Sequence, residues 1–172
     1  MNRSAIPLRM RVLIAAALLA IGLSSGWAQN TPRATDVLAR QADAVIVGHV
    51  ASLVPQWDET HTRIRTQVTI NVSQGIKGTA SGSTLTLVVP GGELDGVGEL
   101  YSDTPVFHRD EDVVVFAQRS DQGLYRVAGG LEGKYTVVKD QSSGKQMISE
   151  RMTLGEFTSE LQQAIGTKGL NH

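Results

Sequence analysis

The side chains that could do chemistry are few, and none of them forms a catalytic or metal-binding pattern. The chain has no cysteine, which excludes thiol catalysis, thiolate zinc sites and disulfides. No two of its four histidines lie at metal-ligand spacing. Each histidine is therefore interpreted as structural rather than as a ligand or a base: His49, His61, His108 and His172.

Two serine motifs match a catalytic pattern only formally. The segment Ser142–Lys145 fits S-x-x-K, but it lies among turn-forming residues and has no accompanying S-D-N or K-T-G element. In Gly78–Gly82 the serine is displaced by one position from the G-x-S-x-G pattern of a nucleophile elbow. Both segments are predicted to be turns, and no catalytic residue is assigned.

Two groups of acidic residues are candidates for an ion site or for a cleft lined by carboxylates. Asp58 and Glu59 lie beside Trp57 in a predicted hairpin. The second group, in a glycine-rich stretch, comprises Glu93, Asp95 and Glu99. Oxygen-rich loops can hold calcium, but the D-x-[DN]-x-[DN]-G spacing of an EF-hand is absent. Solvated acidic loops are the simpler interpretation, and no metal or cofactor is expected.

The composition is that of one folded domain. The chain has 172 residues, of which 41% are hydrophobic and 19% charged, with 16 Lys+Arg against 17 Asp+Glu. These values exclude the low-hydrophobicity regime of a disordered chain. They also exclude the basic excess typical of a nucleic-acid-binding protein, so no nucleic-acid partner is expected.

The N-terminus has the layout of a secretory signal peptide. Three arginines and no acid lie within residues 1–11, and the apolar run Val12–Leu23 follows them. This run is too short to span a membrane, and the small residues Gly26 and Ala28 suit a signal peptidase. We expect cleavage after Ala28, with an uncleaved anchor as the alternative. The mature protein, 29–172, would be a single periplasmic or secreted β-barrel domain without a membrane span.

Hydrophobic periodicity predicts β-strands along most of the mature chain. The alternation over Thr62–Ser73 predicts a strand with one buried and one wet face. The stretch Ala44–Val54 is apolar on both faces, which predicts a central strand, and Gly48 within it indicates a bulge or bend. Further strands are predicted at 84–89, 113–117, 124–128 and 134–138.

Helices are expected at both ends of this strand series. Pro32 is well placed to begin a helix over 32–42, and Thr153 with Glu156 forms a capping box for a helix over 154–165. The fold class is therefore mainly β with flanking helices (α+β), built on an antiparallel barrel of five or six strands. The predicted core contains Ile46, Val68, Ile70, Val72, Leu85, Leu87, Val115 and Phe116.

Several segments resemble, in the same order, those of uncharacterised exported bacterial proteins. The segments are 42–50, 72–78, 90–92, 104–107 and 113–116. Those proteins are similar to the barrel domains of tissue inhibitors of metalloproteinases and of netrins. The resemblance covers about residues 42–138 and implies an oligonucleotide/oligosaccharide-binding (OB) fold. The animal inhibitors place an N-terminal cysteine on the protease zinc, so the absence of cysteine means that their mechanism does not carry over.

The longest aperiodic stretches are the candidate binding surface. They are the hairpin 56–61 and the connection from Gly91 to Asp112, since long loops in compact domains usually bind something. Aromatic and arginine side chains dominate interface energies. The predicted partner-binding residues are Trp57, Tyr101, Phe107, His108 and Arg109.

Two functions follow from these expectations. The first is a non-enzymatic exported binding module that engages a protein in the cell envelope or outside it, for which a peptidase is one candidate. The second is a hydrolase or a sugar-binding accessory domain with Asp58, Glu93 and Asp95 in a cleft. Two carboxylates within about 10 Å that face one pocket would favour the second function. Dispersed, solvent-facing acids would favour the first.

Overall fold

The computed structural model describes residues 34–120 and 123–166. The chain divides into the units Met1–Thr31 and Pro32–His172, and all described residues belong to the second unit. The predicted signal peptide and the predicted helix start at Pro32 lie outside the described residues. Within those residues, no helix combines the length and the apolar character needed to cross a membrane.

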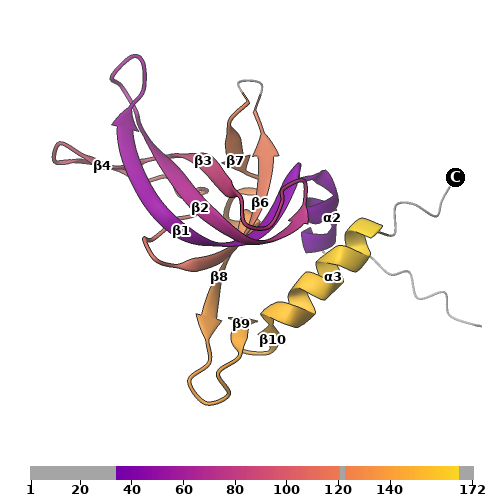
Figure 1. The fold of residues 1–172 in the computed structure, drawn as a ribbon. Coiled ribbons are helices and arrows are strands. Elements are labelled where there is room, and N and C mark those ends of the chain that lie inside the picture. Colours follow the sequence, from indigo (N-terminus) through magenta and orange to yellow (C-terminus); the bar gives the residue numbers. More distant parts are fainter. Residues whose placement is uncertain (1–33, 121–122, 167–172) are drawn as a thin grey trace, which may run out of the picture. The chain divides into compact units, whose positions relative to one another are not determined.

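Five strands close into a barrel (Figure 1). Their order around the barrel is β1 (Ala44–Trp57), β2 (Ile64–Lys77), β3 (Thr84–Pro90), β7 (Tyr125–Val127), β6 (Asp112–Arg119) and β1 again. The first three strands form a meander, and a long connection then brings β6 back beside β1. This arrangement of β6, β1, β2 and β3 is a Greek key.

The expected antiparallel barrel of five or six strands is found with five strands and one parallel seam. β3 and β7 pair in parallel, through the single residue pair Leu87 and Tyr125. The other neighbouring strands of the ring are antiparallel. A closed ring with an odd number of strands cannot alternate direction at every seam, so a five-stranded closure requires one parallel pair.

Two hydrophobic cores lie on the two faces of β1 and β6. The first fills the barrel and includes seven of the eight predicted core residues: Ile46, Val68, Ile70, Val72, Leu85, Leu87 and Val115. The eighth, Phe116, is buried on the outer face of β6, in the second core. Alternate residues of β1 enter each core, which explains why its sequence is apolar on both faces.

The second core is covered by the helices α2 (Ala34–Gln41) and α3 (Leu154–Gly166). The capping box is confirmed, because the Glu156 carboxylate accepts hydrogen bonds from the Thr153 amide and hydroxyl, and Thr153 Oγ1 accepts one from the Glu156 amide. At the other helix, Lys77 Nζ donates to the carbonyls of Ala39, Arg40 and Ala42 at 2.6–3.1 Å. This ammonium satisfies carbonyls that the end of α2 leaves free.

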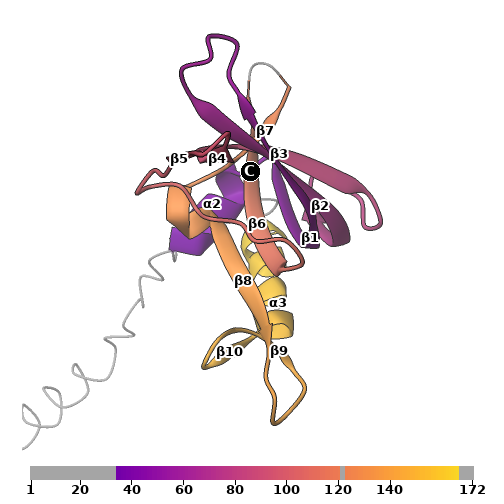
Figure 2. The ribbon, with the colours of Figure 1, turned by 90° about the vertical axis from the view of Figure 1, so that its left-hand side faces the viewer.

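Beyond the barrel, the chain continues through the short 3-10 helix η2 (Gly130–Gly133) into β8. β8 (Lys134–Lys139) pairs with β6 and runs on to β9 (Gln146–Ser149), which pairs with β10 (Met152–Thr153). Figures 1 and 2 show this extension pointing away from the barrel strands. β9 and β10 were not predicted, because strands of two to four residues carry no measurable period.

The predicted turns and the bend are confirmed. The pairing of β1 with β2 shifts register between Val47 and Gly48, where a Cβ would lie 2.6 Å from the Asn71 carbonyl oxygen. The serine motif Ser142–Lys145 turns the chain between β8 and β9. There the Ser142 and Ser143 hydroxyls donate to the Asp140 carboxylate, and these hydrogen bonds lower the pKa of Asp140 to about 2.

The two faces of β2 lead to a stability prediction. Ile70 is fully buried in the barrel, whereas its neighbour Thr69 faces outward and is partly exposed. Ile70→Asp should lower the free energy of unfolding by about 4 kcal/mol or more, because an unpaired charge enters the core. Thr69→Asp should cost about 1 kcal/mol or less. Denaturant unfolding of the two variants checks which face of β2 is buried. Equal losses of unfolding free energy in the two variants would contradict the assignment.

Candidate functional site

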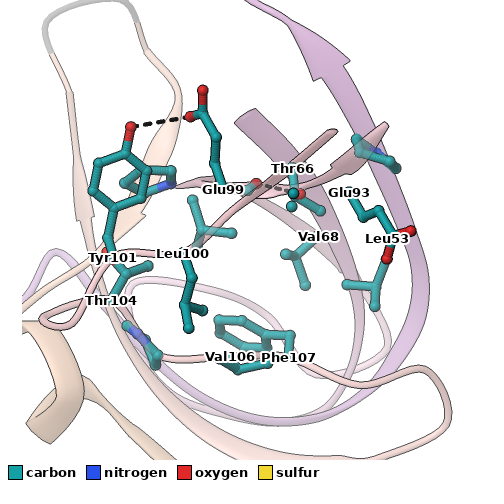
Figure 3. A pocket seen from close by; sticks show the side chains of 17 residues that line it. Leu53, Thr66, Val68, Glu93, Glu99, Leu100, Tyr101, Thr104, Val106 and Phe107 are labelled. Carbon is teal, nitrogen blue, oxygen red and sulfur yellow. Dashed lines mark hydrogen bonds between the residues drawn. The ribbon is translucent and has the colours of Figure 1, made fainter. Parts of the chain in front are cut away.

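An apolar pocket of about 610 Å³ is formed where barrel strands meet the chain that joins β3 to β6. Strands β1, β2 and β3 supply one wall, and the segment 91–107 supplies the other. Figure 3 shows the pocket with the side chains that surround it. Its apolar lining includes Leu53, Pro55, Val68, Val89, Pro90, Leu100, Pro105, Val106 and Phe107.

The chain joining β3 to β6 is not the structureless loop that its sequence indicates. It contains the hairpin of β4 (Gly92–Leu94) and β5 (Val97–Glu99), whose turn includes Asp95 in the left-handed conformation. Gly92 has φ 137°, and a Cβ there would lie 2.4 Å from Thr66 Oγ1. Thr66 Oγ1 in turn donates to the Gly91 carbonyl at 2.7 Å. This close approach to β2 fixes where the hairpin leaves the barrel.

The base and the rim of the pocket are both hydrophobic. Phe107 is 6% exposed and belongs to the barrel core, so it closes the pocket from below. Leu100 is 84% exposed and Val106 is 51% exposed, and both line the same pocket. Exposed apolar side chains gathered at a cavity mark binding sites for apolar groups.

Two glutamates line the pocket, and they differ in their hydrogen bonds. The Glu99 carboxylate accepts hydrogen bonds from the Tyr101 hydroxyl at 3.1 Å and from the Ile64 amide at 3.2 Å. Glu93 makes no side-chain hydrogen bond or ion pair to any described residue. Glu99 therefore stabilises the wall of the pocket, whereas the Glu93 carboxylate remains available to a ligand.

The other acids named for a cleft are engaged in turns. Asp95 accepts a hydrogen bond from Trp57 Nε1 at 3.2 Å, which ties the β4–β5 turn to the β1–β2 hairpin. Asp58 accepts hydrogen bonds from the amides of Thr62 and Arg63 and from the Thr60 hydroxyl. The hydrogen bond from the Thr62 amide is the largest cause that lowers the pKa of Asp58. Neither residue lines the pocket.

The structure places the five predicted partner-binding residues in three locations. Tyr101 and Phe107 line the pocket, Phe107 from a buried position. Trp57 is at the end of β1, where its ring stacks on His61 with centroids 6.5 Å apart. His108 and Arg109 lie outside the pocket; the His108 amide donates to Glu111 and the Arg109 guanidinium to the Ala51 carbonyl.

Sequence reasoning missed Leu100 and Val106, the exposed leucine and valine at the pocket. They lie in an aperiodic segment, where an isolated leucine or valine gives no periodic signal. The available clue was their position, since Leu100 directly precedes Tyr101 and Val106 directly precedes Phe107.

A shielded ion pair holds the connection against the barrel. Lys134 Nζ and Glu111 Oε1 are 2.8 Å apart, and their side chains are only 9% and 11% exposed. Lys134 Nζ also donates to the Val106 carbonyl at 2.6 Å and lies 5.0 Å from the centre of the Phe107 ring. One ammonium therefore fixes both the rim residue Val106 and the base residue Phe107.

A histidine secures the end of the same connection. His49 Nδ1 lies 2.9 Å from Asp112 Oδ1, and its Nε2 lies 3.6 Å from Asp110 Oδ1. The hydrogen bond with Asp112 is the main cause that raises the pKa of His49 above its usual 6.5. Asp110 adopts a left-handed backbone with φ 63°, where the chain turns into β6.

The raised pKa of His49 gives the stability a pH dependence. The protonated form gains the contacts to Asp110 and Asp112, so they stabilise the fold fully below the unfolded-state pKa of about 6.5. This stabilisation is lost as the pH rises through the higher pKa of the folded state. The stability difference between the wild type and His49→Gln should therefore be larger at about pH 5 than at pH 8. Denaturant titrations at both pH values measure it, and a constant difference would contradict this role.

The described residues contain no group of three or more histidine or acidic side chains able to hold a metal ion. No family model matches the chain, and no curated protein matches it either.

Proposed function

We propose that this protein is a non-enzymatic binding module that holds an apolar segment of a partner protein in the pocket of its barrel. The observation that carries this proposal is the pocket itself, whose rim exposes Leu100 and Val106 above the buried Phe107. A volume of about 610 Å³ falls in the range of ligand sites and is large enough to accommodate apolar side chains of a partner segment.

The sequence supports a place of action outside the cytoplasm and a protein partner there. The N-terminal pattern supports export with cleavage after Ala28, and the protein would then meet its partner in the periplasm or outside the cell. A peptidase is one candidate partner. The five-stranded Greek-key closure supports an OB-like barrel. Membership of the tissue-inhibitor and netrin-like proteins stays a prediction from the motifs.

A hydrolase or a sugar-binding accessory domain is the second candidate, and one observation favours it. Glu93 and Glu99 line the same pocket, and acid catalysis on glycosides uses a pair of carboxylates. Two observations disfavour this second function. Glu99 already accepts two hydrogen bonds from the protein, and Asp58 and Asp95 are engaged in turns. A binding role needs only the apolar surface.

The proposal predicts that an exposed leucine matters for binding and not for folding. Peptides selected by display against the wild-type protein should bind Leu100→Ser about tenfold more weakly, because a buried apolar contact at the interface is lost. The melting temperature should change little, since Leu100 is 84% exposed. Fluorescence anisotropy with the selected peptides measures the affinities.

Leu131→Ser is the matched control. Leu131 is also an exposed leucine, at 57%, but it lies in η2 and does not line the pocket. Its replacement should leave the affinities unchanged. Equal effects of the two substitutions would contradict binding in the pocket. Turnover of a glycoside that is abolished by Glu93→Gln would overturn the non-enzymatic role.

A further inference from the structure

A second hollow, of about 550 Å³, adjoins the pocket and is lined by arginines. It shares Pro90, Tyr101 and Thr104 with the pocket, and Arg63, Arg65 and Arg126 line its own surface. We call this hollow the arginine groove. Arg119 lies next to it, with its guanidinium 5.0 Å from the ring centre of Tyr125, another lining residue. Four of the seven arginines in residues 34–166 thus gather here.

The groove has a positive charge that the protein itself does not neutralise. Three guanidiniums and the single carboxylate of Asp103 give its lining a formal charge of +2, whereas the whole chain has −1. The Arg65 side chain makes no hydrogen bond or ion pair to a described residue. Among the described residues, the Arg63 guanidinium donates only to the Tyr101 hydroxyl and the Arg126 guanidinium only to the Gln118 amide oxygen. Clustered guanidiniums without carboxylate partners are suited to an anionic ligand.

The apolar side chains in the lining indicate which class of anionic ligand fits the groove. Leu124 is 43% exposed, and Val88 and Pro90 also line the groove. A sulfated glycan presents anions on a polar backbone and leaves such aliphatic side chains without partners, and the chain's net charge of −1 disfavours a nucleic-acid strand. An acidic peptide offers carboxylates for bidentate contact with arginine together with apolar side chains.

We propose that the arginine groove binds an extended acidic segment of a partner protein. Its carboxylates contact Arg65 and Arg126, and its apolar side chains contact Leu124 and Pro90. The Ser120 hydroxyl, which is shielded and has no partner among the described residues, is a further donor in the lining. The arginines of the groove do not line the apolar pocket, so this inference goes beyond the proposed function and does not depend on it.

The test is binding of a fluorescein-labelled short peptide of alternating glutamate and leucine to the full chain, measured by anisotropy. The wild type should bind it, and affinity should fall as salt is raised, because the contacts are between charges. Arg65→Gln and Arg126→Gln should each weaken binding by roughly tenfold. Arg65→Lys should restore binding only in part, since lysine keeps the charge and loses the bidentate geometry.

The matched control is Arg151→Gln, which removes an exposed arginine from the turn between β9 and β10, away from the groove. It should leave binding unchanged. An Arg65→Gln variant that binds like the wild type, or an equal loss in Arg151→Gln, would overturn the site. Stronger binding of heparin or of a single-stranded oligonucleotide, with the same arginine dependence, would overturn the assignment to an acidic peptide. Loss in Leu100→Ser alone would point to the pocket and also contradict the groove.

Discussion

The ion pair between Lys134 and Glu111 constrains the chain that builds the candidate site. A buried pair of this kind is costly to break, because removing one partner leaves the other charge without compensation. Lys134 lies at the start of β8, outside the barrel ring, yet it holds the Val106 carbonyl and contacts the Phe107 ring. The outer strand therefore fixes the rim and the base of the pocket. His49 adds a second, pH-dependent contact at Asp112, where the same connection enters β6.

The barrel tolerates a long connection because its own closure does not depend on it. β1 pairs with β2 along nearly its whole length and with β6 along its first half, so one strand links both sides of the ring. The helices bury the outer face of β1 and β6, and Lys77 attaches the end of α2 to β2. With both faces of these strands packed, the 91–111 connection forms the β4–β5 hairpin and the pocket wall, and it contributes Phe107 to the barrel core.

Much of the barrel could be predicted from sequence because its strands are long and periodic. The alternation along Thr62–Ser73 identified the correct face of β2, and the capping box at Thr153 located the start of α3. The β4–β5 hairpin escaped prediction because three-residue strands show no period. The segment 72–78, one of those that carry the family resemblance, contains Gly75. Packing explains this glycine, since a Cβ there would lie 1.8 Å from the Thr79 carbonyl oxygen.

The candidate site was only partly predictable. Tyr101 and Phe107 were selected as aromatic residues in an aperiodic segment, and both line the pocket. Leu100 was overlooked, and the pairing of Glu111 with Lys134 joins positions that no local pattern connects. The gathering of Arg63 and Arg65 with Arg126 also depends on barrel closure, because β2 and β7 are separated by β3 in the sheet. Contacts between distant segments decide where these side chains meet.

The most direct measurement of the central claim is site-specific photo-crosslinking in cells of the native host. A benzophenone amino acid in place of Leu100 would sit at the rim of the pocket, and the same group in place of Leu131 would report on exposed surface elsewhere. If the pocket holds a partner, position 100 should give one defined covalent adduct with a second protein, and position 131 should give no such adduct. The same adducts from both positions, or none from position 100, would contradict a partner-binding pocket.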